Sequence, residues 1–163
     1  MSFASRLLEL VTGISRPSPA DEAVEAAETD ERLAAAALLV HVARADGRLA
    51  EAERERLLAA LRARFDLSAD QCESFFERAD AVDLATGDVS ALVDLMGHDV
   101  GPAERRRLIA TAYAIASADG QLHEFEDDLI WRIGRLFGFD DAEIAAVRTE
   151  SVPPGAVLGS GTA

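Results

Sequence analysis

The sequence has no lysine, a single cysteine and few aromatic residues, and these shortages exclude several classes of protein. The lone Cys72 excludes an internal disulfide and any zinc or iron–sulfur site that needs several thiolates. The longest apolar run, residues 33–43, is much shorter than the roughly 20 residues that a helix needs to span a bilayer. The first residues lack the basic region of a secretory signal. We therefore expect a cytoplasmic protein that is not transmembrane.

The basic side chains are few compared with the acidic ones. The 16 Lys and Arg residues, all of them Arg, oppose 30 Asp and Glu residues, which gives a formal charge of −14. This charge repels phosphate backbones, so we expect no nucleic-acid partner, whereas cations and basic protein surfaces are attracted. Aromatic residues make up only 6% of a chain that is rich in alanine, and this composition favours close-packed helices over sheets.

The chain divides into four segments by composition. Residues 1–14 predict an amphipathic helix that packs on the domain or on a partner rather than on a membrane. Residues 15–30 contain two prolines and five acidic residues without an opposing positive charge after Arg16, which predicts an acidic linker. Residues 31–150 predict the folded domain, and the Pro- and Gly-containing residues 151–163 predict a flexible tail.

An eight-residue motif occurs twice in the folded part. Asp-Gly-Arg-Leu-Ala-Glu-Ala-Glu at 46–53 matches Asp-Gly-Gln-Leu-His-Glu-Phe-Glu at 119–126, 73 positions later. Each copy follows an apolar helix, expected at residues 31–45 and 102–118, and precedes an amphipathic helix and then a third helix. The repeats therefore span about 31–82 and 102–148, with one short helix near 88–96 between them. No segment shows sustained period-two alternation, so we expect no sheet. The prediction is an all-α, compact bundle of about seven helices formed by two pseudo-twofold related three-helix repeats.

The two motifs, each preceded by alanine at Ala45 or Ala118, resemble those of the TerB-like domain family associated with tellurite resistance. The resemblance covers about residues 30–150. It implies an all-helical fold with internal duplication and a cluster of acidic residues proposed to bind metal. It also implies a link to membrane-associated stress-response complexes.

The residues of the motif also have individual structural explanations. Gly47 and Gly120 are placed where a left-handed backbone ends the preceding helix. Four glutamates fall in the first turns of the following helices, where the helix dipole favours carboxylates: Glu51, Glu53, Glu124 and Glu126. In contrast, Asp46 and Asp119 lie at helix C-termini, where the dipole disfavours negative charge. These two aspartates therefore require another role, either in accepting a nearby amide or in holding a cation.

A divalent-cation site is the chemical hypothesis that follows from these residues. We expect Asp46, Glu53, Asp119 and Glu126 to be the inner ligands, with Glu51 and Glu124 as outer ligands or docking charges. Carboxylate oxygens suit Ca²⁺, Mg²⁺ or Mn²⁺ rather than Zn²⁺. A complete EF-hand loop is excluded, because the positions that would begin each loop carry no carboxylate. The alternative is that the same acids are solvated residues at dipole-matched helix starts.

The resulting functional hypothesis is a non-enzymatic TerB-like domain, with no catalytic residue and no cofactor besides the divalent cation. It would recruit a protein partner in a stress-response complex, and through such partners it would be peripheral to the membrane. The alternative is a metal-independent acidic module for protein interaction.

Overall fold

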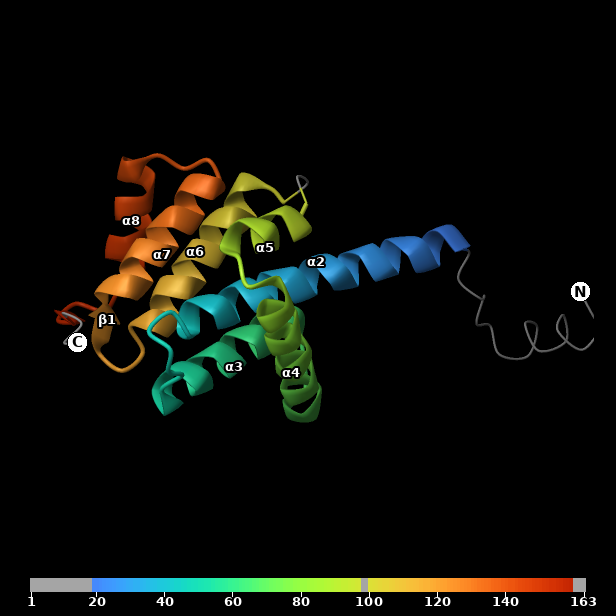
Figure 1. The fold of residues 1–163 in the computed structure, drawn as a ribbon, viewed down its shortest axis with the longest axis horizontal. Coiled ribbons are helices and arrows are strands. Elements are labelled where there is room, and N and C mark those ends of the chain that lie inside the picture. The colour runs from blue at the N-terminus through green and yellow to red at the C-terminus, as the bar shows by residue number, and fades with distance from the viewer. Residues whose placement is uncertain (1–18, 98–99, 160–163) are drawn as a thin grey trace, which may run out of the picture.

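The computed structural model describes residues 19–97 and 100–159, and this part of the chain is almost entirely helical (Figure 1). In chain order its elements are α2 (Pro19–Ala43), α3 (Glu51–Phe65), α4 (Ala69–Thr86), α5 (Val89–Leu95), α6 (Pro102–Ala116), β1 (Gln121–His123), α7 (Glu124–Leu136), α8 (Asp141–Ser151) and β2 (Val157–Gly159). The predicted all-α bundle is confirmed, with seven helices within the described ranges. The helix expected at residues 1–14 lies outside them.

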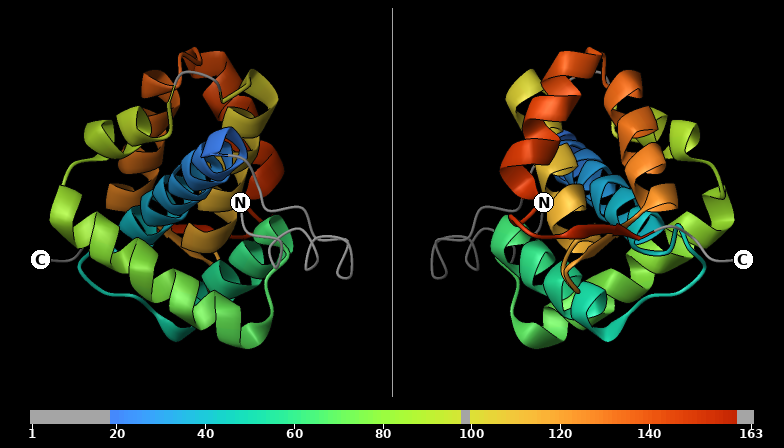
Figure 2. Two further views of the ribbon diagram at one scale, coloured as in Figure 1. Left: turned by 90° about the vertical axis from the view of Figure 1, so that its right-hand side faces the viewer. Right: turned by 90° about the vertical axis from the view of Figure 1, so that its left-hand side faces the viewer.

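Helix α2 forms the centre of the bundle. Its residues from Ala34 to Val40 are all buried, and α3, α4, α5, α6 and α7 all pack against this helix. Viewed nearly along its axis, α2 is surrounded by the other helices (Figure 2). Alanine at four successive positions, 34–37, lets neighbouring backbones approach closely, while Leu38 and Leu39 supply apolar volume. The apolar helix expected at residues 31–45 thus belongs to the central helix of the bundle.

The start of α2 corrects the boundary expected for the acidic linker. Helix α2 begins at Pro19, so residues 19–30 are helical rather than a linker, and its first turns extend beyond the bundle (Figure 1). Proline is tolerated in the first turn of a helix because its missing N–H has no intrahelical partner there. The following segment is rich in alanine and glutamate, which are good helix formers.

Two units with the same order of elements follow one another along the chain. Helices α2, α3 and α4 form the first, α6, α7 and α8 form the second, and the short helix α5 lies between them. The third helix of each unit begins with a capping box: Ser68 and Asp140 accept the backbone N–H groups of Gln71 and Glu143. A pseudo-twofold relation between the units in space stays a prediction.

A small sheet corrects two further expectations. Strand β1 pairs in parallel with β2, with Gln121 opposite Val157, Leu122 opposite Leu158 and His123 opposite Gly159. The prediction that the chain has no sheet is therefore wrong for these short strands. The tail expected to be flexible is strand-paired at residues 157–159. Three residues are too few to produce a recognisable alternation, and the pairing joins segments that are distant in sequence.

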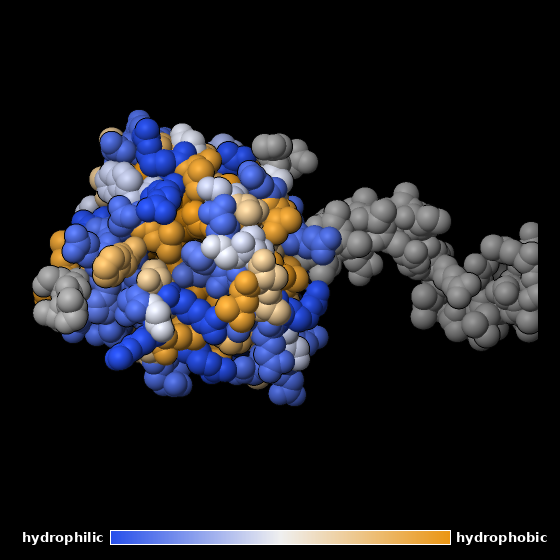
Figure 3. Space-filling view, in the orientation of Figure 1, coloured by the Kyte–Doolittle hydropathy of each residue, from blue (hydrophilic) through white to orange (hydrophobic). Residues whose placement is uncertain are grey.

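The surface of the bundle carries both polar and apolar side chains. Polar side chains dominate the face in Figure 3, with apolar residues between them. Among the described residues, none of the helices combines the length and apolar character needed to cross a membrane.

Two polar features lie within the bundle. Cys72 is a buried free thiol. His41 Nδ1 lies 2.6 Å from Asp83 Oδ1, and this contact links α2 to α4.

Candidate functional site

The two aspartates of the repeated motif have the same local role. The Arg48 backbone N–H donates to Asp46 Oδ1 at 2.9 Å, and the Gln121 backbone N–H donates to Asp119 Oδ1 at 2.8 Å. Between each pair lies a glycine in the left-handed region, with φ of 82° at Gly47 and 86° at Gly120. An aspartate that accepts an amide two residues later is a common stabiliser of a tight turn. This bond explains why each unit has an acid at a position that the helix dipole disfavours.

The last glutamate of each motif also accepts a backbone amide, but unlike the aspartates it is buried. Glu53 Oε2 accepts the Ala50 N–H at 2.9 Å at the start of α3, and Glu126 Oε2 accepts the His123 N–H at 3.1 Å at the start of α7. Glu53 is 2% exposed and Glu126 is fully buried. Carboxylates of capping boxes usually remain solvated. The burial of both glutamates is thus the unusual feature of the two turns.

The carboxylates of the two units influence one another electrostatically. Burial, followed by the charges of Glu53, Asp46 and Asp119, raises the pKa of Glu126 to about 8, although the bond from His123 N–H opposes this. Burial, together with Asp119 and Asp46, also raises the pKa of Glu53. Each buried glutamate therefore lies in the field of acids from both units. Of the residues predicted to form a site, the structure brings these four together: Asp46, Glu53, Asp119 and Glu126.

One oxygen atom in this cluster lacks a hydrogen-bond partner. Glu126 Oε1 is buried and accepts no hydrogen bond from any described residue. A buried carboxylate oxygen without a partner is costly, because it has lost its water and gained nothing in exchange. A proton or a cation at this oxygen would remove the cost. The unpaired atom is therefore the point in the cluster where added positive charge would stabilise the fold most directly.

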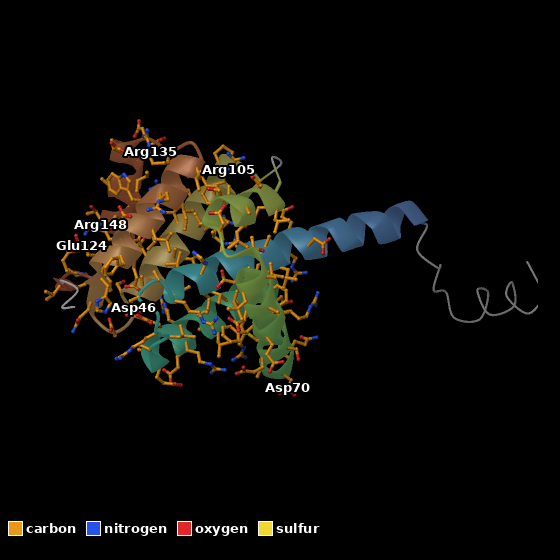
Figure 4. All side chains as sticks on the ribbon, in the orientation of Figure 1. Asp46, Asp70, Arg105, Glu124, Arg135 and Arg148 are labelled. Carbon is orange, nitrogen blue, oxygen red and sulfur yellow. The ribbon has the colours of Figure 1, made fainter. Side chains whose placement is uncertain are left out.

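The donors available around Glu126 are hard oxygen atoms, which suit Ca²⁺, Mg²⁺ or Mn²⁺. Within residues 19–97 and 100–159, however, no three acidic, histidine or cysteine side chains are already arranged around one point as metal ligands. Asp46 and Asp119 are exposed at the turns, while Glu53 and Glu126 lie inside. Figure 4 shows Asp46 at the same end of the bundle as the start of α7. The chemistry of the donors fits a divalent cation, and the side chains form an acidic cluster rather than a finished coordination cage.

The other two predicted ligands lie outside this cluster. Glu51 and Glu124 are exposed in the first turns of α3 and α7. Glu124, which is labelled in Figure 4, also lines a surface pocket. Their role as outer ligands stays a prediction.

His123 is a neighbour of the cluster that was not among the predicted ligands, and Ala50 takes its place in the first unit. Its backbone holds Glu126, and its ring lowers the pKa of Glu53 against the larger effect of burial. The only signal in the sequence that could have indicated this role is its position inside the second motif.

Comparison with known proteins matches most of the described chain to one family. A family model described as tellurite resistance protein TerB covers residues 32–149, which include both motifs and the six helices from α3 to α8 except for the last residues of α8. No curated protein and no solved structure matches the chain significantly.

Proposed function

Because the chain belongs to the TerB family, we propose that this tellurite-resistance-associated helical domain binds a divalent cation at the acidic cluster and recruits a protein partner without catalysing a reaction. The observation that carries the cation half of the proposal is the unpaired, fully buried Glu126 Oε1. Glu126 and Glu53 would hold the ion from inside the bundle, and Asp46 and Asp119 would hold it from the turns.

A bound cation would supply positive charge to a cluster that otherwise contains four carboxylates and, among the described residues, no ion-pair partner for Glu53 or Glu126. Glu53 and Asp46 come from the first unit, and Glu126 and Asp119 come from the second. An ion shared between them would stabilise the arrangement of the two units relative to each other. In this proposal the site is a structural and recruiting one, placed in a stress-response complex, and no residue has a catalytic role.

The experiment that tests the cation half is isothermal titration calorimetry with Ca²⁺, Mg²⁺ and Mn²⁺. The wild type is compared with the double variant Asp46→Asn/Asp119→Asn, which keeps an amide-accepting oxygen at both turns. Asp88→Asn is the matched control, because Asp88 Oδ1 also accepts an amide two residues later, from Ser90, at a site outside the cluster. We expect at least one cation to bind the wild type and Asp88→Asn, and to bind the double variant at least tenfold more weakly. Equal, millimolar binding in all three proteins would remove the cation site.

A metal-independent interaction module is the second candidate function. It is favoured by the amide bonds to Asp46, Glu53, Asp119 and Glu126, because these bonds give each acid a structural role without an ion. This candidate predicts capture of a basic partner that survives EDTA and weakens as salt is added. Capture that is lost in EDTA and restored by one of the three cations supports the first candidate instead.

A further inference from the structure

A surface pocket on the first two turns of α7 combines aromatic and acidic side chains. The pocket has a volume of about 510 Å³ and is lined by Glu124, Phe125, Asp127, Asp128 and Trp131. Phe125 is 63% exposed, which is unusual for a large apolar side chain. Trp131, the single tryptophan of the chain, is oriented by a 3.3 Å hydrogen bond from its Nε1–H to Asp141 Oδ1.

The charge around these rings is negative. Three of the five lining residues are acidic and none is basic. Two arginines pair with the acids from positions outside the lining: Arg148 with Asp127 at 2.9 Å and Arg132 with Asp128 at 3.3 Å. The Asp128 pair is exposed, so water weakens it, and Glu124 is not part of any ion pair in the described chain. The pocket thus presents aromatic faces beside carboxylates that a further cation can reach.

The first unit does not repeat this surface. At the positions 73 residues earlier it has Ala52 in place of Phe125, Arg54 in place of Asp127 and Leu58 in place of Trp131. The duplicated turn therefore folds without the two aromatic rings and with a basic residue where the pocket has an acid. Packing of the turn does not account for the exposed phenylalanine of the second unit.

We infer that this pocket docks an arginine-bearing segment of a protein partner. A guanidinium group stacks on aromatic faces and donates paired hydrogen bonds to carboxylates, and this pocket offers both kinds of contact side by side. The overall charge of −14 attracts a basic segment and opposes an anionic membrane or a nucleic acid. The inference names the chemistry of the partner, and so it rests on the recruiting half of the proposed function rather than on the cation half.

The residues that line the pocket are adjacent in sequence to a residue of the acidic cluster. Phe125 and Asp127 line the pocket, while Glu126 between them is fully buried and belongs to the cluster. One helical turn therefore contributes to both features from opposite sides. Figure 4 shows Glu124 and Arg148, the partner of Asp127, on the same side of the bundle.

The position of the single tryptophan allows a direct binding experiment. The probe is an acetylated, amidated heptapeptide of alternating glycine and arginine, and the control is the same peptide with citrulline, which is similar in shape but uncharged. Because the peptide contains no aromatic residue, a change in fluorescence reports on Trp131. The titrations are carried out in EDTA on the wild type and on the variants Phe125→Ala, Asp128→Asn and Glu55→Gln. Phe125→Ala introduces the residue of the first unit, and Glu55→Gln removes the exposed charge that matches Asp128 in the first unit.

We expect the arginine peptide, and not the citrulline peptide, to change the fluorescence of the wild type. Phe125→Ala should weaken binding about threefold or more, as expected for the loss of an exposed cation–π contact. Asp128→Asn should weaken it more than Glu55→Gln does. Equal weakening by Asp128→Asn and Glu55→Gln would show attraction by net charge alone and would overturn the inference, as would a fluorescence signal that does not change.

Two further measurements separate this inference from the other proposals. The double variant Asp46→Asn/Asp119→Asn should bind the peptide as the wild type does, so failure of the cation site leaves the pocket intact. Sedimentation equilibrium tests whether a second copy of this arginine-containing chain occupies the pocket instead. If the wild type self-associates and Phe125→Ala abolishes the association, a second copy of the chain occupies the pocket, and the inference of a partner segment is overturned. A wild type that is monomeric at all concentrations supports the partner segment.

Discussion

Glu53 and Glu126 occupy the same position of the two units, and both are buried while they accept the backbone N–H three residues earlier. Burial raises the pKa of both carboxyls, and the charge of Glu53 raises the pKa of Glu126 further. Without a bound cation, the protein can lower this cost by keeping a proton on Glu126. The cluster is thus a place where protons and cations compete, and its behaviour with pH follows from this competition.

The stability of the cation-free protein should fall as the pH rises. The folded state holds a proton on Glu126 up to a pKa of about 8, whereas the unfolded chain loses it near the ordinary value of 4.5. The folded state therefore binds more protons between these values, and the free energy of unfolding decreases with pH across this window, by on the order of 4 kcal/mol for this group. Thermal unfolding in EDTA at pH 5.5 and pH 8.5 should show a lower midpoint at the higher pH.

The variant Glu126→Gln should lose most of this pH dependence and be more stable than the wild type at pH 8.5. Its control is Glu143→Gln, because Glu143 makes the same type of amide contact, with Asp140 N–H at 2.9 Å, but is exposed. Glu143→Gln should keep the pH dependence of the wild type. A Glu126→Gln variant with an unchanged pH dependence would show that this carboxyl does not titrate in the window.

Cation binding should release protons near neutral pH. An ion at Glu126 needs the ionised carboxylate, and below pH 8 this residue carries a proton in the cation-free protein. Affinity should therefore increase as the pH rises from 6.5 to 8.5. Calorimetry in buffers with different ionisation enthalpies measures the released protons, and a binding enthalpy that is the same in every buffer would contradict the linkage.

Alanine at the glycines of the two turns should destabilise the fold. Gly47 and Gly120 have φ of 82° and 86°, a region in which a Cβ atom is strained. We expect Gly47→Ala and Gly120→Ala to lower the free energy of unfolding by about 1 kcal/mol each. The control is Gly101→Ala, because Gly101 has φ of −65° and free space around the added methyl group. If urea denaturation gives the same loss for all three variants, backbone strain is not the cause.

Removal of His41 should be costly because Asp83 is buried. His41 Nδ1 lies 2.6 Å from Asp83 Oδ1, and His41→Ala would leave this acid without its partner inside the bundle. We expect a loss of about 2 kcal/mol in urea denaturation. Arg106→Ala removes the more exposed ion pair with Glu150 between α6 and α8 and should cost about 0.5 kcal/mol or less. If the two variants lose similar free energies of unfolding, the burial of Asp83 does not make the His41–Asp83 pair more important than the Arg106–Glu150 pair.

Local patterns predicted the helices and the acids of the turns. The apolar periodicity of residues 31–45 and the capping box at Ser68 act over a few residues, so they can be read directly from the chain. The repeat also indicated which carboxylates matter, because an aspartate was present twice at an electrostatically unfavourable position. The acids at Asp46 and Asp119 are indeed close enough to Glu126 to raise its pKa.

Features that depend on packing between distant segments could not be predicted in this way. The complete burial of Glu126, unlike the exposure of the neighbouring Glu124, depends on which segments cover each side of α7, and a local pattern does not specify them. The pairing of Gln121–His123 with residues 157–159 joins two segments that carry no strand pattern of their own. The linker expected at residues 15–30 is wrong from Pro19 onward, because proline is compatible with the first turn of a helix and α2 begins at this residue.

The pairing of β1 with β2 should make the two otherwise similar turns open at different rates. The second turn is held by a parallel strand, whereas Arg48–Ala50 of the first turn has no strand partner in the described chain. Local opening is easier where fewer contacts must break, so amide hydrogens of the first turn should exchange with solvent sooner than those of the second. An ion shared by the two turns would then be released first from the side of Asp46 and Glu53, and the lifetime of the bound state would depend on the first unit.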